Sequence, residues 1–197
     1  MSKQAGPQSN LAVGKENVHP RVEPLLKNLD RAQSELLSTA DTIPAEAWKR
    51  VPREGSWSAG EIIAHLIMVE RGILSQTDRK LQEPPERVPF LKRFHLPMAM
   101  VEARLIRRKT PMQLDPSLLR TKEEMLAELR EVRGRTRAFL EETNMRDLSS
   151  YRWPHPFLGA FNVYDWVQFI ASHEIRHTKQ IQEIAANLQN AVASSQK

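Results

Sequence analysis

The chain has 197 residues, of which 40% are apolar and 27% charged, with a net charge of +5. This composition is typical of one folded domain with a single core. There is no cysteine, which excludes disulfide scaffolds, thiolate metal sites and cysteine nucleophiles. No apolar run reaches the ~18–20 residues of a membrane span. The first twenty residues lack the apolar segment of a secretory signal, and we expect a cytoplasmic protein.

The positive charge is concentrated in residues 80–109. This stretch contains eight Lys and Arg against three Glu, which is the whole net excess. Such a patch could attract phosphate or a polyanion, but it carries no aromatic platform and no recognition-helix signature. We therefore expect a solvated surface or a face that steers an anionic substrate, with nucleic-acid binding as the alternative.

Two helices are predicted in the first part of the chain. Residues 1–20 mix Ser, Gln, Asn, Gly and Pro without periodicity and are expected to form a flexible tail. From Val22 to Ala40 apolar residues recur every three or four positions, which predicts a helix. A proline-containing loop follows. Ser58-Ala-Gly-Glu61 has the spacing of a capping box and is expected to begin the second helix.

The middle of the chain is broken by prolines. Residues 82–117 contain six of them, and we expect one short helix near Met98–Arg107. A connection of this length is more typical of a lid or a pocket wall than of a simple linker. Thr121-Lys-Glu-Glu124 is a second capping box, and it predicts the start of a third helix.

The last helix has the clearest pattern. Residues 144–161 are expected to form a loop, with Asn162 as the N-cap of the helix that follows. Apolar residues and histidines then recur with helical spacing for more than seven turns: Val163, Trp166, Val167, Ile170, His173, His177, Ile181, Ile184 and Leu188. We found no convincing strand, so we predict an all-α four-helix bundle over residues 21–190 with a long Pro-rich crossover, and a flexible end at 191–197.

The last helix also contains His173-Glu-Ile-Arg-His177, which matches H-E-x-x-H. In zinc proteases this spacing places two ligands on one helical face beside a general base. Such proteases need a third ligand further along the chain. No histidine follows His177, and Glu183 lies on the same helix rotated by ~240°. A third ligand must therefore come from upstream.

His65 is the natural candidate because it lies on the apolar face of the second helix, between Ile62 and Val69. Three inward histidines would bury polar nitrogens that each need a partner, at ~1–3 kcal/mol per unsatisfied group. One divalent ion would satisfy three nitrogens at once. We therefore predict a metal site of His65, His173 and His177, the alternative being three core histidines with separate hydrogen-bond partners.

These residues form a pattern that resembles a known family. The pattern comprises Trp57-Ser58-x-x-Glu61-x-x-x-His65-Leu66, His155-Pro-x-x-Gly159 and His173-Glu-x-x-His177-x-x-Gln180. In order and spacing it is similar, over roughly residues 20–190, to the DinB/YfiT-like superfamily of bacterial four-helix bundles. The resemblance implies a metal site at His65, His173 and His177 for zinc, nickel or iron-type ions, and often a homodimer. It also implies either transferase and isomerase reactions with a small thiol, or hydrolase activity.

Two further residues are candidates for the site. Glu174 lies ~60–100° around the helix from the two histidines, so it could be a catalytic base or an outer partner of a ligand. His155 could line the rim of the pocket and contact a cofactor. We expect a metal-dependent enzyme acting on a small molecule, by thiol S-transfer or by hydrolysis. The alternative is a metal-stabilised stress-response or interaction module, for which a fourth protein ligand would close the site.

Overall fold

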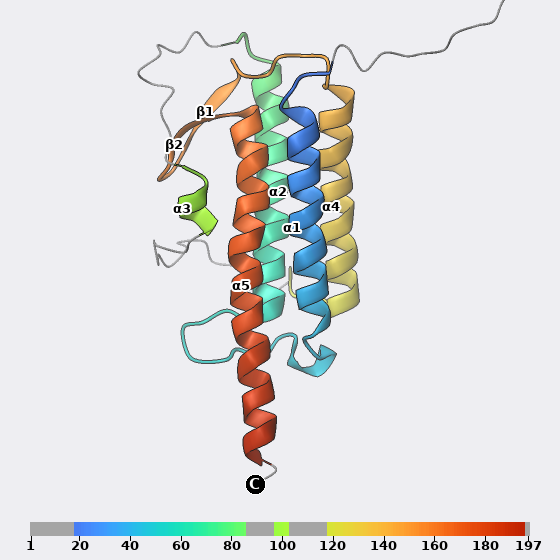
Figure 1. Ribbon diagram of the computed structural model, residues 1–197, viewed down its shortest axis with the longest axis vertical. Helices are drawn as coiled ribbons and strands as arrows, with labels where there is room; N and C mark the ends of the chain where they lie inside the picture. The colour runs from blue at the N-terminus through green and yellow to red at the C-terminus, as the bar shows by residue number, and fades with distance from the viewer. Residues whose placement is uncertain (1–17, 86–96, 103–117, 196–197) are drawn as a thin grey trace, which may run out of the picture.

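A computed structural model describes residues 18–85, 97–102 and 118–195. Four long helices lie along a common axis (Figure 1), and their bounds are α1 (Val22–Asp41), α2 (Ala59–Leu81), α4 (Lys122–Glu142) and α5 (Val163–Ser195). The predicted all-α four-helix bundle is confirmed. Most of the expected tail at 1–20, and most of the Pro-rich and basic stretches, lie outside the described residues.

The helices form a ring that does not follow the order of the chain. Helix α1 packs against α5 and α4, and α2 packs against α4 and α5. As a result α1 and α2 face each other across a diagonal of the bundle, as do α4 and α5. A residue on α4 that points into the centre can therefore reach α5 directly.

The start of α2 is fixed by its cap and by a glycine. Ser58 Oγ accepts a hydrogen bond from the Glu61 amide at 3.2 Å, and the Ser58 amide donates to Glu61 Oε2 at 2.7 Å, which confirms the predicted capping box. The Gly60 amide donates to Trp48 O at 2.9 Å, and a Cβ on Gly60 would lie 3.0 Å from Trp48 Nε1. Only glycine permits this close approach. The second predicted box, at Thr121 and Glu124, is also present.

Two short elements accompany the long helices. A 3₁₀ turn, η2 (Ala45–Ala47), lies in the loop before α2. Helix α3 (Ala99–Glu102) packs on α5, where Ser172 Oγ donates to Glu102 Oε1 at 2.8 Å. The helix expected at Met98–Arg107 is therefore present in part, and its last predicted residues lie outside the described ranges.

The segment expected to be a loop before α5 contains a β-hairpin. Strands β1 (Arg152–His155) and β2 (Gly159–Asn162) pair antiparallel, with Trp153 opposite Phe161. The strands have four residues each and include Pro154, so they are too short to show a clear alternation in the sequence. Asn162 is the N-cap of α5, as predicted: its Oδ1 accepts from the Asp165 amide at 2.9 Å.

Helix α5 continues to Ser195, past residue 190, where the sequence predicts the folded part to end. Residues 191–195 are Ala, Val, Ala, Ser and Ser, with no glycine or proline to end a helix. Figure 1 shows this end projecting beyond the other helices. Within the described ranges, no helix combines the length and apolarity needed to cross a membrane.

The apolar core has two parts and is interrupted by polar groups. The first part includes Ile73, Leu140 and Ile170, and the second includes Ile67 and Ile181. Buried polar side chains on α2, α4 and α5 interrupt this apolar core, and they include His65, Glu70, Arg133, Thr136, Glu174 and His177. The candidate site is therefore built into the core of the bundle.

Candidate functional site

His65, His173 and His177 come together between α2 and α5; we call them the histidine cluster. His65 Nε2 lies 3.3 Å from His173 Nε2, and His177 Nε2 lies 3.1 Å from the same atom. The three ligand atoms lie within 4.8 Å of one another, and no further His, Asp or Glu of the described residues joins them. The predicted three-histidine arrangement is present in the fold.

These spacings fit the donor set of a metal ion. Three nitrogens bound tetrahedrally to zinc at 2.0–2.1 Å lie about 3.4 Å apart. His177 Nδ1 lies 2.5 Å from Gln180 Oε1. Because that oxygen only accepts, the proton of a neutral His177 is on Nδ1, and the Nε2 lone pair faces the cluster. Gln180 thus orients the His177 ring.

Burial favours the neutral form of two of the three rings. Burial lowers the pKa of His65 to about 4. Burial, followed by the neighbouring His177 and His65, lowers the pKa of His173 well below its ordinary value. Neutral imidazole is the form that binds a metal ion. His65 Nδ1 is buried without a partner among the described residues.

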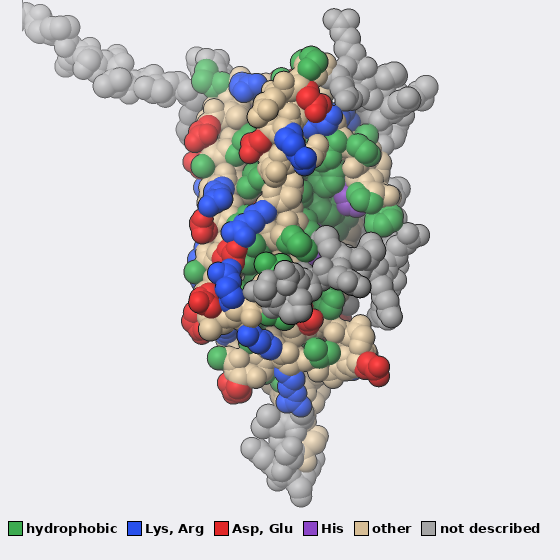
Figure 2. Space-filling model, turned by 180° about the vertical axis from the view of Figure 1, so that it is seen from behind, with side chains coloured by type: hydrophobic (Ala, Val, Ile, Leu, Met, Phe, Trp, Pro, Cys, Tyr) green, Lys and Arg blue, Asp and Glu red, His purple; other side chains and the backbone are tan. Residues whose placement is uncertain are grey.

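Aromatic rings surround the cluster. Trp57, in the loop before α2, lies 5.0 Å from the His65 ring and stacks on His177 at 6.3 Å. Phe169 stacks on His173 at 5.0 Å. Figure 2 shows a histidine side chain reaching the surface in a hollow among hydrophobic side chains. Within the cluster, His65 and His177 are buried and His173 is half-buried, so this apolar setting lacks complete cover.

His155 lies on β1, one ring away from the cluster. Its ring contacts Phe169 at 4.8 Å, and Phe169 in turn stacks on His173. His155 Nδ1 accepts a hydrogen bond from the Phe157 amide at 3.1 Å, and burial lowers the pKa of His155 to about 4. His155 is therefore a neutral residue near the site, and the Phe169 ring contacts both His155 and His173.

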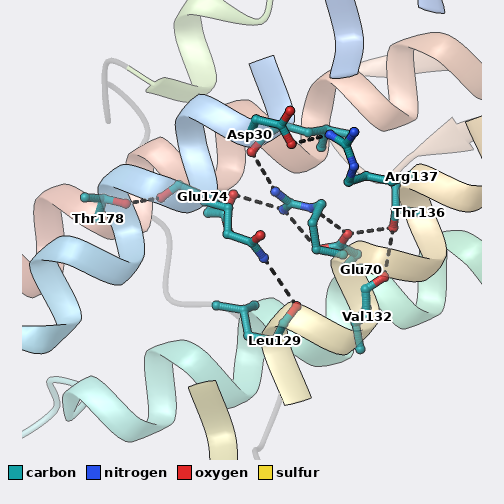
Figure 3. Close-up of polar contacts among 11 residues, drawn as sticks. Asp30, Glu70, Leu129, Val132, Thr136, Arg137, Glu174 and Thr178 are labelled. Atoms are coloured by element: carbon teal, nitrogen blue, oxygen red, sulfur yellow. Dashed lines mark hydrogen bonds and ion pairs between the residues drawn. The ribbon is translucent and has the colours of Figure 1, made fainter. Parts of the chain in front are cut away.

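Glu174 points away from the cluster, into the centre of the bundle. Its Oε2 accepts from Arg133 Nη2 at 2.9 Å, across the diagonal from α4. Arg133 also donates to Glu70 Oε1 and Oε2, at 2.9 and 3.1 Å, and to Leu29 O at 2.8 Å. Thr136 Oγ1 donates to Glu70 Oε1 at 2.6 Å. Figure 3 shows these contacts; we call Arg133, Glu70, Glu174 and Thr136 the Arg133 network.

The charges of the network affect one another strongly. Burial raises the pKa of Glu174 to about 7; Arg133 opposes this rise and Glu70 adds to it. Burial by itself would lower the pKa of Arg133, but Glu174 and Glu70 together raise it above its ordinary value. The sequence analysis missed Glu70 and Arg133. A charged residue on the apolar face of a predicted helix could have indicated them: Glu70, for example, lies between Ile67 and Ile73.

The fold and the cluster define a class of protein: a four-helix bundle with a three-histidine centre between two of its helices. The family model of the DinB superfamily matches residues 28–181. The chain belongs to this superfamily.

Two further comparisons found similar proteins. The uncharacterized protein YuaE of Bacillus subtilis (strain 168) is 26% identical over 147 residues, which is 74% of this chain and 88% of YuaE. Among solved structures, YfiT from Bacillus subtilis matches with a TM-score of 0.60 and 17% identity, over 93% of this chain and 94% of that one. YfiT is described as a probable metal-dependent hydrolase with an unusual four-helix bundle topology. At this identity the match shows the shared fold.

Proposed function

We propose that this protein is a metal-dependent hydrolase that uses the histidine cluster to bind one divalent ion of the zinc, nickel or iron type. The observation that carries the proposal is the convergence of three histidine ring nitrogens from two helices, all within 4.8 Å of one another. Burial lowers the pKa values of His65 and His173, and the contact of His177 Nδ1 with Gln180 Oε1 orients the His177 ring.

The number of ligands favours an enzyme over a metal-stabilised module. Structural zinc sites have four protein ligands, whereas catalytic sites have three and keep one position open. Among the described residues only His65, His173 and His177 form the cluster. A divalent ion held in this way lowers the pKa of water or of a small thiol that it binds, and so supplies a nucleophile at neutral pH.

The chain's own residues would hold and enclose this centre. His65 provides the ligand from α2, and the two ligands from α5 are fixed one helical turn apart. Trp57 and Phe169 pack against the ligand rings and limit their rotation. The apolar surroundings favour a small substrate with an uncharged portion next to the reacting group. A small thiol as co-substrate, a homodimer and a cytoplasmic location are further parts of the proposal.

The test begins with metal content and proceeds to turnover. The protein would be stripped of metal, reloaded separately with Zn²⁺, Ni²⁺ and Fe²⁺, and assayed against chromogenic esters, amides and phosphoesters, with the His65→Ala variant as control. We expect hydrolysis that requires metal and is lost in the variant. Turnover only with an added small thiol would instead indicate S-transfer. Bound metal without turnover of any substrate would favour the interaction module.

A further inference from the structure

The Arg133 network contains more negative than positive charge. Two carboxylates, Glu70 and Glu174, share the single guanidinium of Arg133, and all three side chains are almost fully buried, with 1–3% of their surface exposed. A buried charge without a counter-charge is costly. A closed structural network would need only one acid for its one base.

The excess charge is on Glu174. Glu70 accepts two hydrogen bonds from Arg133 and one from Thr136, so both of its oxygens are engaged. Glu174 accepts one bond from Arg133, through Oε2. Its Oε1 is buried and has no partner among the described residues. The network itself therefore leaves Glu174 incompletely compensated.

The same carboxylate borders the metal site. Glu174 directly follows His173 in the chain, and both line a small cavity of about 10 Å³, together with Glu70 and Arg133. The surroundings of this cavity are otherwise apolar, so charges on either side are poorly screened. Figure 3 shows Glu174 among the residues of the network.

We propose that Glu174 is a positioning residue that compensates the charge of the metal ion, held in place by Arg133, rather than the general base of the H-E-x-x-H pattern. This inference rests on the proposed function, because it needs a cation at the histidine cluster. Three neutral imidazoles bring no negative charge to a divalent ion. The surplus carboxylate of the network supplies one such charge inside the core.

The proposal predicts that one substitution has opposite effects on the fold and on the metal. Glu174→Gln keeps the shape and an acceptor for Arg133 Nη2, and leaves Arg133 and Glu70 as a balanced pair. The metal-free variant should therefore be at least as stable as the wild type. Its Zn²⁺ affinity should fall by about tenfold or more, the usual effect of removing an outer partner of a ligand. If Glu174 served only an ordinary structural salt bridge, the metal-free variant would be less stable than the wild type, and its Zn²⁺ affinity would be unchanged.

The experiment measures Zn²⁺ affinity by competition with a chromophoric chelator, and metal-free stability by urea unfolding, at one mildly alkaline pH. Glu183→Gln is the matched control, since it removes the same charge from an exposed position of α5, where solvent screens it. We expect its Zn²⁺ affinity to equal that of the wild type. The variant Glu70→Gln/Arg133→Met/Glu174→Gln, which has no charge in the network, should bind Zn²⁺ as weakly as Glu174→Gln.

The outcomes separate this inference from the proposed function. A wild-type chain that does not bind Zn²⁺ overturns both. Zn²⁺ binding by the wild type, with equal affinity in Glu174→Gln or in the charge-free variant, overturns the role of Glu174 alone. A Glu174→Gln chain that does not fold without metal also overturns it, because the charge would then serve the fold.

Discussion

The histidine cluster and the Arg133 network lie next to each other and both use α2 and α5, but their polar atoms are partnered differently. In the network, the Nε, Nη1 and Nη2 atoms of Arg133 all donate to oxygens within 3.1 Å. In the cluster, three Nε2 atoms face one another, and His65 Nδ1 has no partner among the described residues.

This difference indicates that Arg133 serves the fold, whereas the histidine cluster serves a ligand. The guanidinium joins α1, α2 and α5 to α4 through its own bonds, so it needs no further partner. Three nitrogens that point at one another cannot satisfy one another, because imidazoles at this spacing share at most one proton between two atoms. In our proposal a cation completes the cluster, whereas the guanidinium of Arg133 is satisfied by oxygens of the protein itself.

The largest effect should come from removing the centre of the network. Arg133→Met leaves two buried carboxylates without a counter-charge, so we expect a loss of about 3–5 kcal/mol in the free energy of unfolding. Urea unfolding of the metal-free protein measures this loss. Arg135→Met on the exposed side of the same helix should change stability by less than about 0.5 kcal/mol. Equal losses in the two variants would contradict the structural role of Arg133.

Acid should lower the contribution of His65 to the stability of the metal-free protein. The pKa of His65 is about 4 in the folded chain and 6.5 ordinarily, so the unfolded chain takes up the proton first as the pH falls. The contribution of His65 to stability is therefore constant above pH 6.5 and decreases between 6.5 and 4, by up to about 3 kcal/mol.

The measurement is urea unfolding of the metal-free protein across this pH range. Other groups titrate in the same window, among them Glu174, whose raised pKa acts in the opposite direction. The difference between the wild type and His65→Asn isolates the effect of His65. Parallel stability curves for the two proteins would show that His65 is not held neutral by the fold.

His65→Ala tests whether the metal ion is bound from both helices. His173 and His177 lie on one helix, and only His65 links metal binding to the packing of the bundle. We expect the variant to lose most of its metal content, together with the rise in melting temperature that added metal gives the wild type. That rise corresponds to about 2.7 kcal/mol at a metal concentration of 100 Kd. Metal retained at the wild-type ratio would falsify the three-histidine site.

The smallest effect concerns one link of the network. Thr136→Val keeps the side-chain volume but removes the hydroxyl that donates to Glu70 Oε1 at 2.6 Å. Since Arg133 still bonds this oxygen, we expect a loss of only about 1 kcal/mol by urea unfolding. Zn²⁺ affinity should stay within about twofold of the wild type, because Glu174 is unchanged. A tenfold weaker Zn²⁺ affinity would show that metal binding at the histidine cluster depends on the bond between Thr136 and Glu70.

Much of the fold followed from local patterns in the sequence. The helices begin at the predicted caps, Ser58, Thr121 and Asn162, because capping depends on residues within one turn. The pairing of His173 with His177 also followed from helical spacing, and His65 was placed by the apolar residues on either side of it. These features depend on the 3.6-residue period, which a sequence displays directly.

The tertiary structure decided the direction of Glu174 and the partners of the buried charges. Glu174 is about 100° from His173 around the helix, so the sequence allows it to face either the metal or the centre of the bundle. It faces the centre because α4 lies diagonally opposite α5 and Arg133 reaches across. The hairpin before α5 was missed for a different reason: its strands are neighbours in the chain but too short to show a period. The direction of Glu174 depends on contacts between segments that are distant in the sequence, and no local pattern displays such contacts.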